Sequence, residues 1–220
     1  MKTIPTKTAH FFALMVCFIT LLACKNAKNG NLNAENLAQG TMTFSITPPK
    51  ESNSGMMGAA MPKEGKLYFD RNKAAIEFSM MGIMTVRLIT NGEAHTQSLL
   101  IGGLGGKQAA TATEADTQEM LDSLHVKLEE TNETKEILGL TATKYLLRDT
   151  LKNTTASIFI AKDAPVEGIF WNLPIGNIKG LILGYEYGID GKVWQLTATK
   201  IDPQKPRPDE FIIPDRKSVV

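Results

Sequence analysis

The chain is poor in the side chains that build metal sites and catalytic centres. It has two cysteines, Cys17 and Cys24, and three histidines among its 220 residues. Neither His95 nor His125 lies at a metal-like spacing from cysteine, histidine or carboxylate residues, so no metal site is predicted. No nucleophile lies in a recognisable pattern with a base. We therefore expect no cofactor and no enzymatic activity.

Charge of one sign is also lacking, and this excludes a further class of partner. The formal net charge is +1, so no basic surface for a nucleic acid is predicted. The glycine-rich run ending at Gly106-Lys107-Gln108 has Gln where a phosphate-binding loop needs Ser or Thr for magnesium. A nucleotide site is therefore not expected.

The first 24 residues are typical of an export signal that ends in a lipid attachment site. Lys2 and Lys7 precede an almost wholly apolar run at residues 11–22, which is too short to span a bilayer of about 30 Å. The run ends at Leu21-Leu22-Ala23-Cys24, which resembles the lipobox of bacterial lipoproteins. In that family the cysteine receives fatty acyl chains such as palmitate. An ordinary secretory signal with an incidental cysteine is the alternative.

This interpretation divides the chain into four parts. Residues 1–23 are the signal peptide, residues 24–39 a polar flexible linker, residues 40–214 the folded domain and residues 215–220 a C-terminal tail. If Cys24 is lipidated, the mature domain has no disulfide, and its stability must come from an apolar core. We expect an envelope protein held on a membrane by its acyl chains. Because Lys25 to Lys28 lacks acidic residues, the outer membrane with the domain facing the periplasm is favoured.

The folded part has the alternation of a mainly β protein. Met42, Phe44 and Ile46 alternate with polar residues, as in a half-buried strand. Asn91-Gly92 predicts a two-residue hairpin turn, and residues 102–106 predict a flexible connection. The expected strands are 41–47, 67–70, 74–80, 85–90, 93–100, 126–131, 135–138, 141–149, 154–161, 181–187 and 192–201.

One helix is predicted with a defined start. Thr111 and Glu114 fit a capping box, and apolar residues follow at helical spacing, which indicates a helix from Glu114 to Leu124. Residues 163–173 are ambiguous, and a short helix there is one alternative. The predicted fold class is mainly β (α+β): a curved antiparallel sheet or half-barrel with one or two short helices.

Three short motifs carry a resemblance to known proteins. They are Ile137-Leu138-Gly139 followed by Thr143-Lys144-Tyr145, then Gly180-Leu181-Ile182-Leu183, and finally Phe211-Ile212-Ile213-Pro214. Together they resemble motifs of the GLPGLI group and the LolA/LolB-like superfamily of envelope lipoproteins. Unlike the contiguous family motif, Leu173-Pro174 is separated from Gly180 by five residues. The resemblance implies a curved antiparallel half-barrel with helices on its concave side, and carriage of acyl chains by some members.

Candidate ligand-facing residues follow from the alternation. Two apolar sets should face inward, toward a helix that carries Met120, Leu121 and Leu124. A methionine-rich loop could act as a lid over an apolar opening, although simple filling of the core is the alternative. The inward set is Ile76, Phe78, Met80, Trp194 and Leu196, and the lid set is Met56, Met57 and Met61.

Two further sites match a three-residue O-glycosylation signal of some envelope proteins. They are Thr150 in Asp149-Thr150-Leu151 and Ser123 in Asp122-Ser123-Leu124. The sequence thus favours a non-enzymatic binding module for an acyl chain, lipid or lipoprotein. The alternative is a scaffolding or interaction subunit of an envelope complex with no small ligand.

Overall fold

The computed structural model describes residues 32–49, 62–104, 106–151, 154–171, 173, 175, 178–189 and 192–213. The proposed lipidation site Cys24 lies outside the described residues, as do the proposed lid residues Met56, Met57 and Met61. The described residues from Asn33 onward belong to one compact unit.

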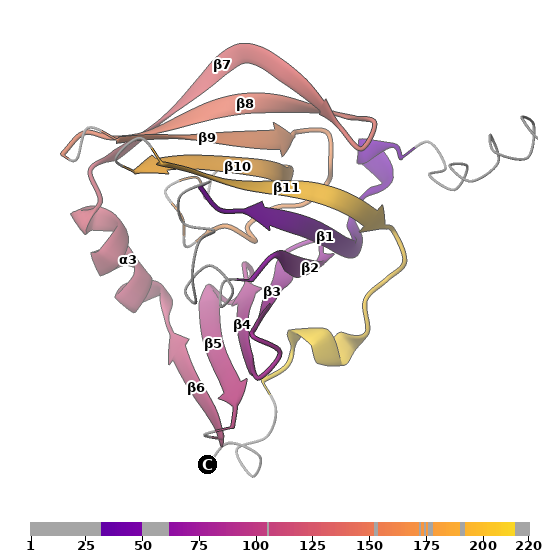
Figure 1. The fold of residues 1–220 in the computed structure, drawn as a ribbon, viewed down its shortest axis with the longest axis vertical. Coiled ribbons are helices and arrows are strands. Elements are labelled where there is room, and N and C mark those ends of the chain that lie inside the picture. Colours follow the sequence, from indigo (N-terminus) through magenta and orange to yellow (C-terminus); the bar gives the residue numbers. More distant parts are fainter. Residues whose placement is uncertain are drawn as a thin grey trace, which may run out of the picture. The chain divides into compact units, whose positions relative to one another are not determined.

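Eleven strands, one α-helix and two 3-10 turns make up the described fold (Figure 1). The strands are β1 (Gln39–Thr47), β2 (Glu64–Asp70), β3 (Lys73–Met80), β4 (Met84–Asn91), β5 (Thr96–Gly103), β6 (Gly106–Ala112), β7 (Val126–Ile137), β8 (Leu140–Asp149), β9 (Thr154–Ala161), β10 (Leu181–Ile189) and β11 (Lys192–Asp202). The helix is α3 (Glu114–Ser123), and the 3-10 turns are η2 (Ala34–Asn36) and η4 (Pro208–Phe211).

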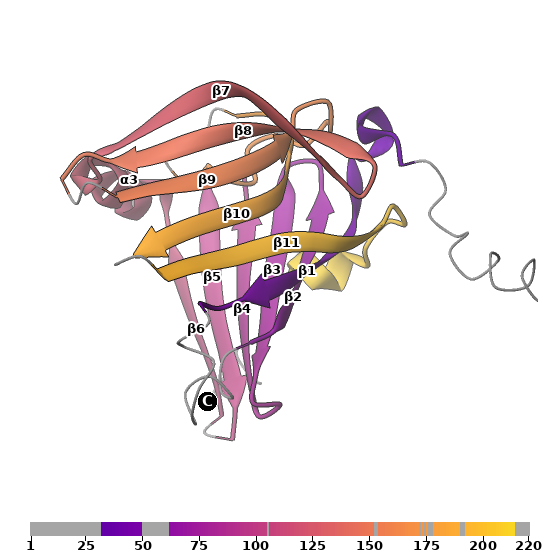
Figure 2. The ribbon, with the colours of Figure 1, turned by 45° about the horizontal axis from the view of Figure 1, so that its top comes forward.

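All eleven strands form one antiparallel sheet in the order β6-β5-β4-β3-β2-β1-β11-β10-β9-β8-β7. The sheet does not close, because β6 and β7 are its two edges. Figures 1 and 2 show that it bends strongly: β7 to β11 run across β2 to β6 rather than beside them. The predicted fold class, a curved antiparallel sheet with few helices, is confirmed.

The core lies on the concave face of this sheet. Met42, Phe44 and Ile46 are buried and alternate with less buried polar residues along β1, as the sequence predicts. β1 pairs with β2 on one side and with β11 on the other. The first and last strands of the domain are therefore joined at the centre of the sheet.

A long segment between β9 and β10, residues 162–180, covers the concave face. We call it the β9–β10 connection. Glu167 N donates to Arg71 O at 3.2 Å, and Gly180 N donates to Val166 O at 2.9 Å. Its described residues contain turns and no helix, which removes the short helix considered for residues 163–173. Its fully buried apolar side chains are Ala164, Val166, Ile169 and Ile175.

Helix α3 ends within one residue of the predicted position, but its cap and its place in the fold differ from the prediction. Thr113, not Thr111, is the N-cap, and its N–H and hydroxyl donate to Asp116 Oδ2 at 2.8 and 2.7 Å. These hydrogen bonds hold the pKa of Asp116 below its usual range. The helix packs beside β6 on the way to β7 (Figure 1), and Leu124 after it is 41% exposed. The expectation that this helix faces the inward apolar set is therefore wrong.

Three strand predictions are corrected as well. The turn after Asn91 spans residues 92–95, so β5 begins at Thr96 rather than Glu93. The glycine-rich connection predicted at residues 102–106 is largely paired strand, and β6 follows it as an unpredicted edge strand. Residues 126–137 form one strand with an irregularity between Glu130 and Thr134, where two separate strands were expected. Within the described ranges, no helix is both long and apolar enough to cross a membrane.

Candidate functional site

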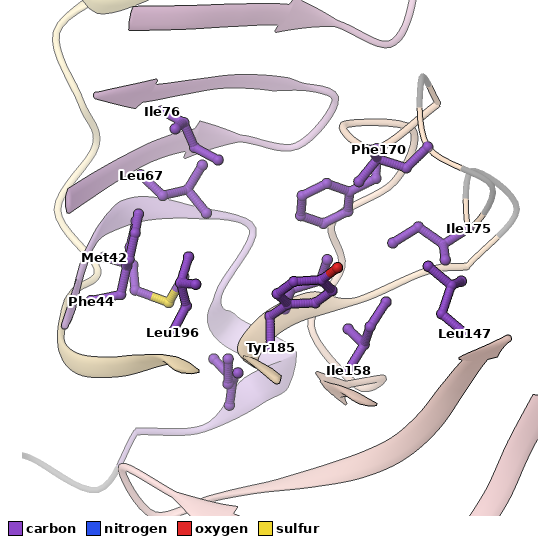
Figure 3. A pocket seen from close by; sticks show the side chains of 14 residues that line it. Met42, Phe44, Leu67, Ile76, Leu147, Ile158, Phe170, Ile175, Tyr185 and Leu196 are labelled. Atoms are coloured by element: carbon purple, nitrogen blue, oxygen red, sulfur yellow. The ribbon is translucent and has the colours of Figure 1, made fainter. Parts of the chain in front are cut away.

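An apolar cavity of about 290 Å³ lies between the concave face of the sheet and the β9–β10 connection. In Figure 3, residues from β1 to β3 stand on one side and Phe170 and Ile175 of the connection on the other. The lining residues are Met42, Phe44, Leu67, Ile76, Leu147, Ile158, Phe170, Leu173, Ile175, Ile182, Leu183, Gly184, Tyr185 and Leu196.

A bulge in β10 shapes one wall of this cavity. In a regular strand only every second residue faces a given side. Ile182, Leu183, Gly184 and Tyr185 nevertheless all line the cavity, and the pairing of β10 with β9 shifts register between Ile182 and Gly184. Bulges of this kind often redirect side chains beside functional sites.

The cavity is almost free of polar side-chain atoms. Tyr185 supplies the one hydroxyl among the described residues that line it. Burial, and after it the neighbouring Tyr187, raises the pKa of Tyr185, so its hydroxyl stays protonated and neutral at physiological pH. An apolar hollow of this kind accepts apolar guests more readily than water.

The cavity reaches the surface at the connection. Leu173 both lines the cavity and is 40% exposed, so it marks a place where the hollow opens. Several other lining side chains, such as Ile76 and Leu196, are half-buried although they belong to the concave face. Part of the cavity lining is therefore in contact with solvent.

Two of the five residues predicted to face inward line the cavity, one contacts a lining residue, and two lie outside the lining. Ile76 and Leu196 line the cavity. Phe78 does not, but its ring packs edge-on against the lining residue Phe44, at 5.6 Å between centroids. Met80 and Trp194 are half-buried and lie outside the lining.

Most lining residues were not found from the sequence. β8, β9 and β10 supply Leu147, Ile158 and Tyr185, and the connection supplies Phe170 and Ile175. The strands did show alternation, but alternation alone does not say which strands face one another across a curved sheet. The connection has no periodicity, so its apolar residues carried no signal.

The remaining predicted sites have simple surroundings. Thr150 is exposed in the turn after β8, and its hydroxyl donates to His125 O at 2.9 Å. Ser123 is the last residue of α3. His95 stacks on Trp171 at 5.4 Å between ring centroids, and its Nδ1 lies 2.8 Å from Glu114 Oε1. Among the residues that the structure describes, no group of three or more metal-binding side chains converges.

The fold and the site define a mainly β protein with one open, curved antiparallel sheet, whose apolar concave face is covered by the β9–β10 connection. No known protein family matches the chain, and no curated protein matches it. Two crystal forms of PNGF-II share the fold, with a TM-score of 0.52 and 15% or 14% identity over 79% or 78% of this chain. The matched region spans 30% or 29% of PNGF-II, and at this identity the likeness shows the fold alone. LprF from Mycobacterium bovis overlaps at a TM-score of 0.32 and 8% identity, over 80% of this chain and 93% of LprF, which is too weak to support an inference.

Proposed function

We propose that this protein is a lipoprotein of the bacterial cell envelope. We further propose that its folded domain is a non-enzymatic binding module for a single acyl chain. The observation that carries the proposal is the apolar cavity of about 290 Å³ under the β9–β10 connection. The LolA/LolB-like resemblance of the sequence motifs supports the same class of ligand. The bound acyl chain could belong either to a free lipid or to another lipoprotein.

The size of the cavity limits what it can take. Dry apolar cavities of about 150 Å³ bind benzene, and ligand pockets usually begin near 300 Å³. This cavity suits a segment of one chain rather than a lipid with two or three chains. Each buried methylene stabilises the complex by about 0.8 kcal/mol, and association opposes this by at least about 4 kcal/mol. We therefore expect weak to moderate affinity.

A filled-cavity variant tests the proposal. Leu147 lines the cavity, whereas Leu146 lies outside the lining and points to the other face of β8. Leu147→Trp should abolish binding of decanoate and decan-1-ol in titration calorimetry, because the new side chain occupies the hollow. Leu146→Trp is the matched control and should bind as the natural protein does. Absence of binding to the natural protein at tens of micromolar, or equal binding by Leu147→Trp, would reject the carrier function.

The envelope location is a separate part of the proposal and has its own test. It rests on the basic start, the short apolar run and Leu21-Leu22-Ala23-Cys24. Cys24→Ala should block acylation and leave a longer precursor, seen by mass spectrometry and membrane fractionation in a bacterial host. A variant that matures to the same size and stays with the membrane would contradict lipidation at this cysteine.

A second candidate function, an interaction subunit, is favoured by one surface. The turns after β3 and β5 expose Met81, Ile83 and Leu104 to 61%, 53% and 90%. The two turns lie side by side. The backbone next to Leu104 approaches that of Ile83, since a Cβ built on Gly103 would lie 3.1 Å from Ile83 O. Grouped exposed apolar side chains are typical of surfaces that bind a protein partner. This candidate needs no small ligand.

Crosslinking distinguishes this candidate from the first. A photoreactive residue at position 104 should give one discrete protein adduct in cells, which Ile83→Ser removes. Position 133, an exposed glutamate on β7, is the control and should give none. Adducts that persist in Ile83→Ser would show that the apolar turns do not form a specific interface.

A further inference from the structure

A second hollow of about 440 Å³ lies on the same concave side of β7 and β8 and has a different chemical character. Its floor is apolar, and its rim carries two lysines and one glutamate. The lining residues are Leu128, Glu130, Tyr145, Lys162, Ile178 and Lys179. We call it the lysine cleft.

The lysine cleft and the apolar cavity share a wall. Tyr145 of the cleft is directly opposite Ile158 of the cavity across β8 and β9. Leu128 of the cleft is likewise opposite Leu147 of the cavity across β7 and β8. Directly opposed residues have Cβ atoms about 5 Å apart. The two hollows therefore adjoin along these two pairs.

The charged groups of the cleft already form charge-assisted hydrogen bonds. Tyr145 donates its hydroxyl to Glu130 Oε2 at 2.9 Å, and Lys162 Nζ donates to Glu130 Oε1 at 2.5 Å. Burial, with the hydrogen bond to Glu130 and its charge, raises the pKa of Tyr145 to about 12, so the tyrosine remains a donor. Lys179 Nζ lies 2.6 Å from Glu167 Oε1.

The two lysines are able to exchange these partners. The side chains of Lys162 and Lys179 are 45% and 70% exposed, and exposed ion pairs stabilise a fold by only about 0–1 kcal/mol. The lining residues of the cleft have two positive charges and one negative charge, and Glu167 beside Lys179 adds a second negative charge outside the lining. An anion placed there competes with Glu130 and Glu167 for the ammonium donors, and because those ion pairs are exposed, replacing them costs the fold little stability.

We propose that the lysine cleft binds the anionic head, a carboxylate or a phosphate, of a single-chain amphiphile whose chain occupies the adjoining apolar cavity. The inference rests on the proposed function and adds the head-group chemistry to it. An acyl chain in the cavity has only the Tyr185 hydroxyl as a polar side-chain neighbour among the lining residues. A charged head left there without donors would be strongly unfavourable. The adjoining lysine cleft supplies ammonium donors from Lys162 and Lys179 for such a head group.

Three probes of equal chain length test this proposal: decanoate, decyl phosphate and decan-1-ol, each titrated into the full protein. We expect at least one of the two anions to bind about tenfold more tightly than the alcohol, as donors to a charged group predict. The double variant Lys162→Gln/Lys179→Gln should lose this preference and keep the affinity for the alcohol. The relative affinity of decanoate and decyl phosphate identifies the head group.

Lys127→Gln/Lys200→Gln is the matched control, since it makes the same change in net charge at exposed positions outside both hollows. It should keep the preference for the anion. Equal binding of anions and alcohol by the natural protein, or an unchanged preference in Lys162→Gln/Lys179→Gln, would overturn the cleft proposal and leave the cavity as an acyl site. Failure of all three probes to bind would reject both the cleft proposal and the proposed acyl-chain binding.

Discussion

Gly92 shows how a single residue connects a turn to the cover of the cavity. A Cβ at this position would lie 2.4 Å from Gly168 O, which belongs to the β9–β10 connection. The β4–β5 turn itself is organised by Asn91, whose Oδ1 accepts hydrogen bonds from Glu93 N and Ala94 N at 3.0 and 3.1 Å. Close approach of two backbones, and not the turn alone, therefore requires glycine at residue 92.

Gly92→Ala should reduce the free energy of unfolding by about 1–3 kcal/mol, because the connection must move away from the added methyl group. Urea unfolding followed by tryptophan fluorescence measures the change. Gly102→Ala is the matched control: its Cβ would meet only Lys107 Cγ at 3.9 Å. We expect this control to stay within about 0.5 kcal/mol of the natural protein. Equal unfolding curves for the two variants would show that the Gly92–Gly168 contact is not close in solution.

At the scale of elements, η4 is attached to the face of the sheet opposite the cavity by arginine–carboxylate contacts. Arg87 Nη2 donates to Glu210 O at 2.7 Å and also to the Glu210 carboxylate. Arg207 Nη2 donates to Glu210 Oε1 at 2.8 Å. The Arg87 guanidinium also lies 5.3 Å from the centre of the Tyr68 ring. The network joins the last described element to β2 and β4.

This network predicts a pH dependence with a defined sign. Burial raises the pKa of Glu210, but hydrogen bonds from Arg207 and Arg87 outweigh it and leave the pKa lowered. The stabilisation is therefore present above the unfolded pKa of about 4.3 and is lost as the pH falls through the folded pKa. Glu210→Gln should lower stability at pH 7 by about 1–2 kcal/mol and lose less on acidification than the natural protein does.

Thermal unfolding at several pH values between about 3 and 7 checks this prediction, a range that brackets the unfolded carboxyl pKa. Glu119→Gln on α3, an exposed position, is the control and should follow the natural protein at every pH. Parallel pH profiles for Glu210→Gln and the natural protein would show that the Glu210 network does not contribute to acid unfolding.

At the scale of the whole molecule, the fold depends on pairing between distant parts of the chain. β1 joins β2 to β11, so the two halves of the sheet meet through the first and last strands. The chain has only two cysteines, both before residue 25, and no metal-binding group converges in the part that the structure describes. We therefore expect the domain to be held by its apolar core and its backbone ladder.

The melting temperature should accordingly be the same with and without a chelator or a reductant. A structural metal or disulfide would each contribute several kcal/mol, and its removal would be plainly visible. Differential scanning calorimetry of the protein in EDTA, in dithiothreitol and in neither measures this. A fall of many degrees with EDTA would indicate a metal, and a fall with dithiothreitol would indicate a disulfide.

The sequence by itself determined part of the local structure of this protein. Alternation of Met42, Phe44 and Ile46 with polar residues predicted β1 because side chains of a strand face opposite sides in turn. Helical spacing located α3, although the cap was placed two residues too early. Ile76 and Leu196 were assigned to the concave face by the same alternation, and both line the cavity.

Only the tertiary structure decided which of these faces meet. Phe170 and Ile175 reach the cavity because the β9–β10 connection folds over the concave face, and no periodic pattern marks such a segment. Tyr145 and Ile158 become a shared wall because β8 and β9 pair in one register and not in another. Local spacing sets where each side chain points along its own strand, whereas curvature and register set what lies opposite. The cavity depends on curvature and register, so only the tertiary structure could show which residues line it.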